Sequence, residues 1–311
     1  MCSNKINNGA EACPSFPIYE DKIKPILFEV FTETRIDVED LLLGRGTEDF
    51  KENIPMINNR DYEIIKDDLA RLGLRRGDAV LMHSSYKSLG GLCGGIETLI
   101  SAILSTIGDT GTLIVPTLSY AFVTAESPVF DHALTPSCVG AVSEYVRRLD
   151  GARRSIHPTH SCAAIGYKQD YYIDGHELDR TPVGENSPFY KLSEDGGKLL
   201  MLGCGIAPNT SMHGVEERFG AWYLLTEKPS PYTVIAGGES YTIPFRRHNI
   251  LQNGFVQCYK RLEEVLDARY MPSAEVHGAT SYLIDSHEMW RAGLDALKSD
   301  ELFFVKRCET R

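Results

Sequence analysis

The 311-residue sequence predicts a layered α/β/α fold with a largely parallel central sheet and an antiparallel C-terminal elaboration. Short apolar runs alternate with segments whose apolar residues recur every three or four positions, as in buried strands and amphipathic helices. A chain of this length buries about three quarters of its unfolded surface, so its core needs no covalent support. The 42% hydrophobic and 24% charged residues agree with a globular protein and exclude a disordered or coiled-coil chain.

The first sixty residues differ from the rest of the chain. Residues 1–60 contain four prolines, mixed charges and no strong apolar periodicity. We therefore predict an N-terminal extension over 1–60 and one folded domain over 61–311. The extension is a candidate lid or subunit contact, and a homodimer is one assembly that it would serve.

Helices and strands begin to alternate directly after the extension. Ile65, Leu69 and Leu72 fall on one face of a helix predicted over 61–73. The same spacing predicts helices over 94–108 and 139–149, and apolar runs predict buried strands over 79–82, 111–116, 162–166 and 198–203. Strands that alternate with helices favour a layered fold in which the sheet is largely parallel.

The last third of the chain changes in character. Two strand-like runs meet at Gly237 and Gly238, which predicts a hairpin over 232–245. Helices are predicted over 259–266 and 286–297, and strand-like runs over 274–278 and 302–305. We interpret these elements as antiparallel additions to the same domain.

The composition and charge exclude several classes of protein. The chain carries 32 basic and 43 acidic residues, a net charge of −11, and lacks the basic footprint that nucleic-acid binding needs. Its apolar runs are too short to span a membrane. The eight cysteines form no C-x-x-C pair, which argues against a structural zinc site. Because the N-terminus has no secretory signal, we expect a cytoplasmic protein with reduced thiols.

Small hydroxyl residues and glycines follow the first predicted strand. The stretch begins with His83, Ser84 and Ser85 and reaches a predicted helix at Gly94 and Gly95. Such a turn leaves backbone N–H groups exposed at a helix N-terminus, a geometry that binds phosphate. The spacing matches neither G-x-G-x-x-G nor a Walker loop, which excludes a nicotinamide or ATP assignment. A tight turn with good capping residues is the alternative.

A second motif, His-Pro-Thr-His-Ser-Cys, precedes another predicted strand. Its histidines, His157 and His160, lie where α/β folds often place catalytic or binding residues. Two histidines could also be ligands of a metal ion. A metal site needs a third ligand, however, and Pro158 makes this segment extended rather than helical. We therefore expect no metal.

The third motif places two carboxylates near a histidine. A helix capped by Thr210 or Ser211 would begin here. Glu216 and Glu217 then lie three and four residues beyond His213, on the same helix face. A carboxylate that orients an imidazole raises its basicity, so His213 is the candidate general base. A surface ion pair on a capped helix is the alternative.

Together the three motifs resemble the aminoglycoside 3-N-acetyltransferases, antibiotic-modifying enzymes whose fold differs from the common GNAT fold. The resemblance covers roughly residues 61–304 and includes R-S-x-H-P-x-x-S over 154–161 and N-T-S-x-H-x-x-E over 209–216. The six matching stretches lie within 83–95, 111–117, 135–141, 154–166, 184–188 and 197–216. Each stretch alone is a weak signal, but six in this order are specific.

The resemblance implies an acyltransferase that moves an acetyl group from acetyl-CoA to an amine, typically the 3-amino group of a 2-deoxystreptamine aminoglycoside. It makes 61–311 an acetyltransferase domain and implies a role in antibiotic resistance. His213, supported by Glu216 or Glu217, would act as base, and His157 would line the reaction centre. The residues that it implies for the cofactor site are His83, Ser84, Ser85, Gly94, Gly95, Thr135, Val139, Arg154 and Ser161.

The residue chemistry agrees with this reaction. A protonated amine cannot attack a thioester until it loses a proton, and a His–Glu pair supplies that step. No cysteine has a recognisable histidine partner, so direct transfer is favoured over an acyl-enzyme. The net charge suits a polycationic amine as acceptor. One departure concerns Ala207 and Pro208, which stand where some relatives carry an acid.

The sequence leaves three other functions open. An N-acetyltransferase of the same fold would act on another amine, such as a natural-product precursor or an amino sugar. A non-catalytic CoA-binding protein would bind CoA without turning over an amine. A metal-dependent amidohydrolase would use His157, His160 and His213.

Overall fold

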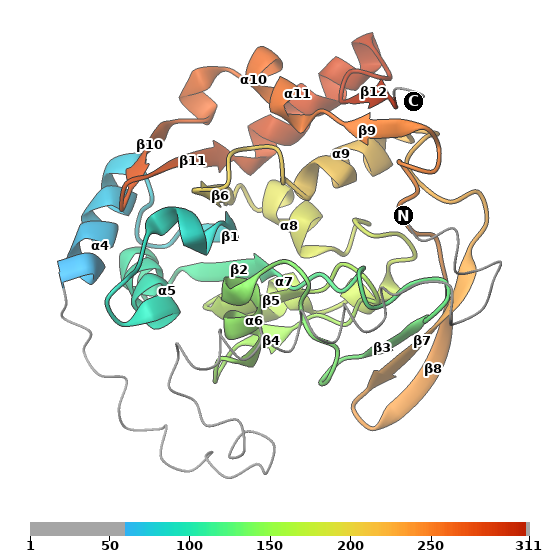
Figure 1. Cartoon of the computed structure of the whole chain (residues 1–311), viewed down its shortest axis with the longest axis horizontal. Coiled ribbons are helices and arrows are strands. Elements are labelled where there is room, and N and C mark those ends of the chain that lie inside the picture. Colours follow the sequence, from blue (N-terminus) through green and yellow to red (C-terminus); the bar gives the residue numbers. More distant parts are fainter. Residues whose placement is uncertain (1–59, 309–311) are drawn as a thin grey trace, which may run out of the picture. The chain divides into compact units, whose positions relative to one another are not determined.

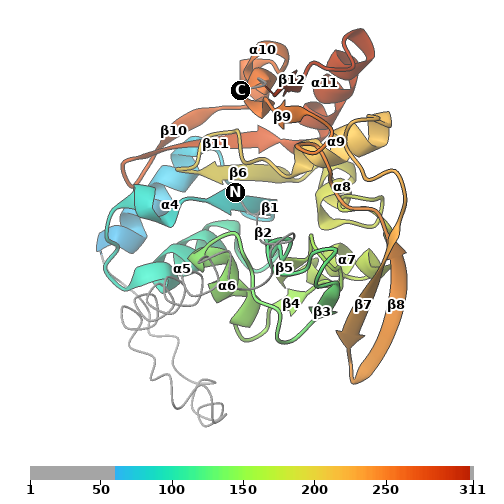
Figure 2. The ribbon, with the colours of Figure 1, turned by 45° about the vertical axis from the view of Figure 1, so that its right-hand side comes forward.

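A computed structural model describes residues 60–308 (Figure 1). The extension predicted over 1–60 lies outside the described residues, apart from Arg60, where the first described helix begins. The described part forms a central sheet covered by helices (Figure 1, Figure 2), so the predicted α/β class is confirmed. No helix of this part of the chain is long and apolar enough to cross a bilayer.

The central sheet has seven strands in the described residues. In spatial order they are β10 (Ser273–Val276), β11 (Ala279–Asp285), β6 (Lys198–Leu202), β1 (Ala79–Ser84), β2 (Thr112–Pro116), β5 (Cys162–Gly166) and β4 (Arg153–Arg154). Five strands run in one direction, and only β5 and β11 run in the other. The predicted largely parallel sheet is confirmed, with β6, β1 and β2 as its parallel centre.

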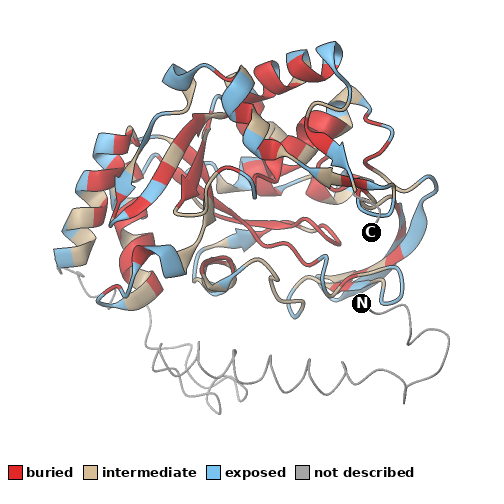
Figure 3. Cartoon of the chain, turned by 45° about the horizontal axis from the view of Figure 1, so that its top comes forward, coloured by how far each residue is buried: buried red, intermediate tan, exposed pale blue. Residues whose placement is uncertain are grey.

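Residues of the central strands are mostly buried (Figure 3), and their side chains enter apolar clusters on both faces of the sheet. Leu81 and Leu199 belong to one apolar cluster, whereas Val80 and Leu200 belong to the cluster on the other face. Helices α4 (Arg60–Leu72), α5 (Gly95–Ile107) and α6 (Ala141–Arg148) cover the face of Val80. Helices α7 (Gln169–Ile173), α8 (Pro188–Glu194), α9 (Ser211–Phe219), α10 (Leu262–Val265) and α11 (Ser286–Ser299) cover the face of Leu81.

Glycines set the starts of two helices. Gly94 precedes α5 with a φ of 81°, in the left-handed region that glycine adopts without strain. The helix predicted over 139–149 begins two residues later, at Ala141, because Gly140 has a φ of 118°. Such a φ is incompatible with an α-helix, so α6 starts only beyond it.

A separate three-stranded sheet contains the predicted hairpin. The strands are β7 (Ser230–Ala236) and β8 (Glu239–Phe245), and β3 (Val129–Asp131) pairs with β7. The turn residues Gly237 and Gly238 have φ values of 59° and 82°. Two consecutive positive φ angles are what a tight two-residue hairpin requires, so the glycines explain the turn.

Two C-terminal elements differ from the sequence prediction. The helix predicted over 259–266 consists of a 3-10 turn, Tyr259–Arg261, followed by the four-residue α10. The strand expected over 302–305 is displaced to β12 (Val305–Arg307), which pairs with β9 (Phe255–Gln257). Residues before β12 form a turn because the Asp300 carboxylate accepts the backbone N–H of Leu302 at 3.0 Å. The other 3-10 turns are Tyr86–Leu89, His176–Leu178 and Ala268–Tyr270.

Candidate active site

A cavity of about 550 Å³ opens at the carboxyl ends of the parallel strands. His83 and Ser84 end β1, Pro116 ends β2 and Cys204 follows β6, and all four line the cavity. Parallel strands bring their carboxyl ends to one edge of a sheet, where α/β folds bind ligands. His213 of α9 also lines this space. The first and third sequence motifs therefore meet at one site.

His213, Tyr259 and Glu216 form a continuous hydrogen-bonded chain. The Tyr259 hydroxyl lies 2.7 Å from His213 Nδ1 and donates to Glu216 Oε2 at 2.6 Å. The Glu216 carboxylate is fully buried and accepts a second hydrogen bond, from the Tyr223 hydroxyl at 2.9 Å. His213 Nδ1 and Glu216 Oε2 are 3.6 Å apart, so Tyr259 provides the shorter link.

The direction of these hydrogen bonds fixes the tautomer of His213. A phenol has one proton, and burial together with Glu216 raises the pKa of Tyr259 well above its usual value. Tyr259 therefore keeps its proton and donates it in the hydrogen bond to Glu216, so its oxygen accepts the hydrogen bond from His213 Nδ1–H. His213 Nε2 is then unprotonated, and the Gln257 amide nitrogen lies 3.4 Å from it. An imidazole whose unprotonated nitrogen lies at a cavity and accepts only this long hydrogen bond is suited to act as a base.

Glu217 supports a different histidine. Its Oε1 accepts the backbone N–H of Val183 at 2.9 Å and the His248 Nε2–H at 3.0 Å. Burial raises the pKa of this carboxyl to about 7. His248 lines the cavity beside His213, with ring centroids 4.2 Å apart. Of the two carboxylates that the sequence proposes for His213, the hydrogen bonds join it to Glu216.

The start of α9 brings these groups to the cavity. Neither Thr210 nor Ser211 caps the helix through its side chain, although Thr210 is the N-cap residue. The Asn209 carboxamide oxygen instead accepts the N–H of Ser211 at 3.1 Å. The helical spacing then places Glu216 one turn beyond His213, as the sequence predicts.

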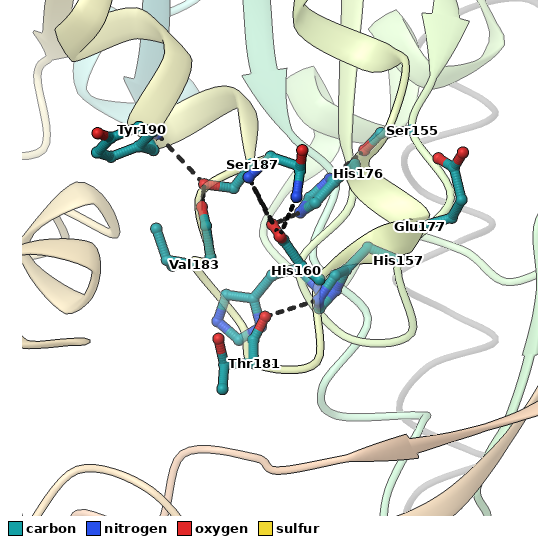
Figure 4. Close-up of polar contacts among 12 residues, drawn as sticks. Ser155, His157, His160, His176, Glu177, Thr181, Val183, Ser187 and Tyr190 are labelled. Atoms are coloured by element: carbon teal, nitrogen blue, oxygen red, sulfur yellow. Dashed lines mark hydrogen bonds and ion pairs between the residues drawn. The ribbon is translucent and has the colours of Figure 1, made fainter. Parts of the chain in front are cut away.

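His157 is fully buried and does not line the cavity. Figure 4 shows its ring hydrogen-bonded to Thr181. Its Nδ1 accepts the backbone N–H groups of Thr159 at 3.3 Å and His160 at 2.8 Å. Nε2 consequently carries the proton and donates to the Thr181 carbonyl at 3.1 Å. Burial lowers the pKa of His157 to about 3, so the ring stays neutral and holds the turn. The prediction that His157 lines the reaction centre stays a prediction, and the histidine of this motif that lines the cavity is His160.

His160 lines the cavity three residues later. Its Nδ1 is 2.9 Å from the Thr159 hydroxyl, and its ring centroid is 5.0 Å from that of His248. The sequence analysis weighs His160 only as a metal ligand. Among residues 60–308, no three His, Cys, Asp or Glu side chains are placed to share a metal ion.

The residues predicted for the cofactor separate into two groups. His83, Ser84 and Val139 line the cavity. Nε2 of His83 is buried without a hydrogen-bond partner among the described residues, and burial lowers its pKa to about 4. Ser85 instead accepts a hydrogen bond from the Ser88 hydroxyl at 2.8 Å.

The other predicted cofactor residues lie outside the lining. Arg154 is buried and donates to the Thr135 carbonyl at 2.6 Å and to the Ser161 hydroxyl at 3.0 Å. Burial lowers the pKa of its guanidinium to about 9. These three residues tie together the loops behind the cavity, while Gly94 and Gly95 form the start of α5.

The sequence analysis misses several lining or supporting residues, among them Tyr223, Arg247, His248 and Tyr259. Arg247 and His248 follow β8 and carry no recognisable motif. Tyr259 is 43 residues from Glu216, so no local spacing connects them. Only the fold reveals their contacts.

Comparison with known proteins identifies the family. The family described as aminoglycoside 3-N-acetyltransferase matches residues 81–298. Aminoglycoside N(3)-acetyltransferase IX of Micromonospora chalcea is 34% identical, covering 76% of this chain and 92% of the relative. A gentamicin complex of an aminoglycoside acetyltransferase AAC(3)-IVa variant has a TM-score of 0.67 at 27% identity, with 81% and 93% of the two chains covered.

A second structure, AAC-IIIb with CoASH, has a TM-score of 0.65 at 24% identity, with 76% and 96% of the two chains covered. At this identity the likeness is one of fold. The predicted resemblance is confirmed by the family match and by the Micromonospora chalcea relative. The chain belongs to the aminoglycoside 3-N-acetyltransferase family and is an acyltransferase.

Proposed function

We propose that residues 61–311 transfer an acetyl group from acetyl-CoA to an amine, with His213 as the general base. The observation that carries this proposal is the hydrogen-bonded chain from His213 through Tyr259 to the buried carboxylate of Glu216. It leaves the lone pair of His213 Nε2 at a cavity of about 550 Å³, a volume typical of ligand pockets. The unpaired nitrogen of His83 supports a ligand at the other motif.

The proposed reaction has one covalent step on the carbonyl. The protonated amine loses one proton to His213 Nε2, and its nitrogen then attacks the thioester carbon. A C–N bond forms and the C–S bond breaks. The second proton lost by the nitrogen passes to the sulfur, so that CoA leaves as the thiol, and His213 returns its proton to solvent. When Nε2 is protonated, the positive ring still donates from Nδ1–H to the Tyr259 oxygen, and the Tyr259 hydroxyl still donates a hydrogen bond to Glu216. The buried carboxylate stabilises the imidazolium without taking its proton.

Direct transfer is supported by the chemistry of Cys204, the cysteine in the described lining. Burial raises the pKa of its thiol to about 11, so the thiolate nucleophile is scarce at neutral pH. Its Sγ lies 3.6 Å from the His83 carbonyl oxygen. An acetyl-cysteine intermediate is therefore not part of the proposal.

The first candidate acceptor is the 3-amino group of a 2-deoxystreptamine aminoglycoside, which would make the protein a resistance enzyme. The named relatives support it. A second candidate is an amine outside the aminoglycosides, favoured by a lining that holds no carboxylate among the described residues. The free thiols of the described cysteines support a cytoplasmic site of action.

The test is CoA release from acetyl-CoA with kanamycin, gentamicin, neomycin and a panel of other primary amines. Replacement of the base, His213→Ala, should lower kcat about 10²–10⁴-fold and leave acetyl-CoA affinity nearly unchanged. Near-normal turnover in a folded His213→Ala variant would move the base elsewhere. The proposed activity would be contradicted by a protein that binds CoA but does not release CoA from acetyl-CoA with any of the amines tested.

A further inference from the structure

The tight turn between β10 and β11 contains a strained residue. His277 has a φ of 47°, and among residues 60–308 it is the one non-glycine residue in the left-handed region. Most side chains avoid this conformation, which persists only where surrounding contacts hold it. The turn lies beside α4 (Figure 1), and the His277 N–H donates to Asp68 Oδ2 of that helix at 2.8 Å. Helix α4 therefore holds the strained backbone, which fixes where the imidazole lies.

Both nitrogens of the His277 ring face oxygen atoms that accept hydrogen bonds. Nδ1 lies 2.8 Å from the Leu89 carbonyl oxygen, which has no proton to give, so Nδ1 carries one. Nε2 lies 3.3 Å from Asp61 Oδ1. Hydrogen bonds from the Cys93 N–H and from His277 lower the pKa of Asp61, so this carboxyl is ionised at pH 7. An ionised carboxylate only accepts, which favours a proton on Nε2 as well and makes His277 a cation.

This cation connects two points of one loop to α4. Leu89 ends the 3-10 turn that follows β1, and Cys93 lies two residues before α5. His277 Nδ1 holds the Leu89 carbonyl, while the Cys93 N–H donates to Asp61 Oδ2 at 2.8 Å. One ion pair thus fixes both ends of residues 89–93. We call the contacts of His277 and Asp61 with Leu89 and Cys93 the loop clamp.

The clamped loop belongs to the first sequence motif, which begins at the cavity, where Ser84 is part of the lining. A Cβ atom on Gly203, directly after β6, would come within 2.9 Å of Ser88 and 3.1 Å of Ala279. The loop, the start of β11 and the carboxyl end of β6 therefore lie together. The glycines and backbone N–H groups of this motif are those for which the sequence predicts phosphate binding.

Resting on the proposed acetyl transfer, we propose that the loop clamp positions residues 85–95 to bind the phosphates of acetyl-CoA. His277 is then a positioning residue, because it acts through the loop and does not touch the donor. Backbone N–H groups bind a phosphate most tightly when they are fixed in the bound orientation before the ligand arrives. The positive His277 also neutralises Asp61, which would otherwise repel a phosphate.

A substitution of His277 can remove the ring and keep the backbone. Asparagine tolerates a positive φ better than most residues, so His277→Asn should fold, and urea denaturation checks that it does. We expect the Kd of CoA, measured by calorimetry, to rise about tenfold, the usual strength of a hydrogen bond to a charged group. Pantetheine, which lacks the phosphates, should bind the variant and the wild type equally.

The matched control is His287→Asn. His287 is exposed, and its Nδ1 also contacts a carbonyl oxygen, that of Ser193 at 3.3 Å, on a helix that covers the other face of the sheet. Its replacement should leave the Kd values of CoA and pantetheine unchanged. Equal losses of CoA and pantetheine binding in His277→Asn would overturn the proposal, because a merely structural role does not single out the phosphates.

Asp61→Ala tests the loop clamp from its other end. If only charge mattered, removal of a carboxylate near the loop would tighten the binding of phosphates. Loss of the contacts with Cys93 and His277 should instead raise the Kd of CoA severalfold. The direction of the change therefore separates positioning from charge, and it decides the proposal even if His277→Asn does not fold. A CoA complex of Asp61→Ala that is tighter or unchanged would overturn the proposal.

Kinetics keep the loop clamp apart from the proposed catalysis. In His277→Asn the KM of acetyl-CoA should rise about tenfold, whereas kcat, the acceptor KM and the KM of S-acetylpantetheine should stay near their wild-type values. A kcat that falls with an unchanged acetyl-CoA KM would contradict the proposal. If no amine supports CoA release, the proposed acetyl transfer is wrong, and calorimetry with CoA and pantetheine still decides whether the loop clamp serves the phosphates.

Discussion

The phenol of Tyr259 stands between a histidine at the cavity and a buried carboxylate. The sequence predicts His213 and Glu216 because both lie on one helix, where a spacing of three residues has a fixed geometry. It does not predict Tyr259, which comes from a segment 43 residues further along the chain. A contact between distant segments leaves no periodic signal in a single sequence.

The hydroxyl of Tyr259 can be removed without changing the size of the side chain. Tyr259→Phe should lower kcat about tenfold or more, which is less than the full general-base contribution. The rising part of the plot of kcat against pH should move to lower pH. The reason is that the His213 imidazolium loses the hydrogen bond to the Tyr259 hydroxyl, which links it to the Glu216 carboxylate. The measurement is the pH profile of kcat with acetyl-CoA near saturation.

The matched control is Tyr223→Phe, which removes a hydroxyl from Glu216 Oε1 but none from His213. In this variant kcat should rise over the same pH range as in the wild type. Equal shifts in both variants would assign the effect to the carboxylate alone rather than to the bridge through Tyr259.

His157 is expected to act on stability. His157→Ala removes the acceptor of two buried backbone N–H groups, which should lower the free energy of unfolding by about 2 kcal/mol or more. An asparagine side chain accepts N–H groups two and three residues ahead, so His157→Asn should recover most of this stability. Urea denaturation and turnover are measured on both variants. Lost turnover in a stable His157→Asn protein would give His157 a catalytic role.

Helix α9 positions the proposed base by close packing against α11. A Cβ atom on Gly214 would come within 2.5 Å of Trp290 and 2.6 Å of Val183.

The predicted helices rest on local signals along the chain, and the prediction holds for α4, α5, α9 and α11. Strand direction has no such local signal: the apolar run of β5 resembles that of β2, yet the two pair antiparallel.

Enlarging Gly214 should therefore move α9. Alanine favours an exposed helix by about 1 kcal/mol over glycine, but the clash in Gly214→Ala should reverse the sign and destabilise the protein by about 1–3 kcal/mol. Turnover should also fall because His213 is the adjacent residue. The graded control is Gly293→Ala in α11, where the closest atom would be Val215 Cγ1 at 2.9 Å. Unfolding curves in which Gly293→Ala is the more damaging change would contradict this account.

The whole molecule combines an acidic composition with buried neutral histidines. The net charge of −11 predicts an acidic cleft, but the described cavity lining holds Arg247 and no carboxylate. A total charge says nothing about where the charged residues lie, so the sequence alone could not predict the charge of the cavity lining. Burial keeps the pKa values of His83, His157, His160, His176 and His248 below their usual value.

These histidines predict the response of the whole fold to acid. Their pKa values are depressed in the folded state, so the unfolded chain takes up more protons once the pH falls below about 6.5. Stability should be complete above that pH and be lost as the pH falls toward about 4 for His83 and about 3 for His157. The raised carboxyls, Asp179 at about 6 and Glu217 at about 7, act in the opposite direction but are fewer.

Urea denaturation between pH 7.5 and pH 4.5 measures this loss. Each fully buried neutral histidine contributes roughly 1.4 kcal/mol per pH unit in this window, reduced by the two carboxyls. In Glu217→Gln the carboxyl that opposes the histidines is absent, so the loss on acidification should be steeper than in the wild type. A free energy of unfolding that stays constant down to pH 4.5 would show that the histidines are not held neutral by the fold.

The place of Tyr259 in the chain has a consequence during protein synthesis. Tyr259 follows β9, whose partner β12 is Val305–Arg307, and the adjacent Cys258 N–H donates to the Phe304 carbonyl at 2.7 Å. A nascent chain on the ribosome has made His213 and Glu216 long before the strand that anchors Tyr259 emerges. The growing polypeptide therefore acquires the complete hydrogen-bonded chain only after residues 304–307 have left the exit tunnel.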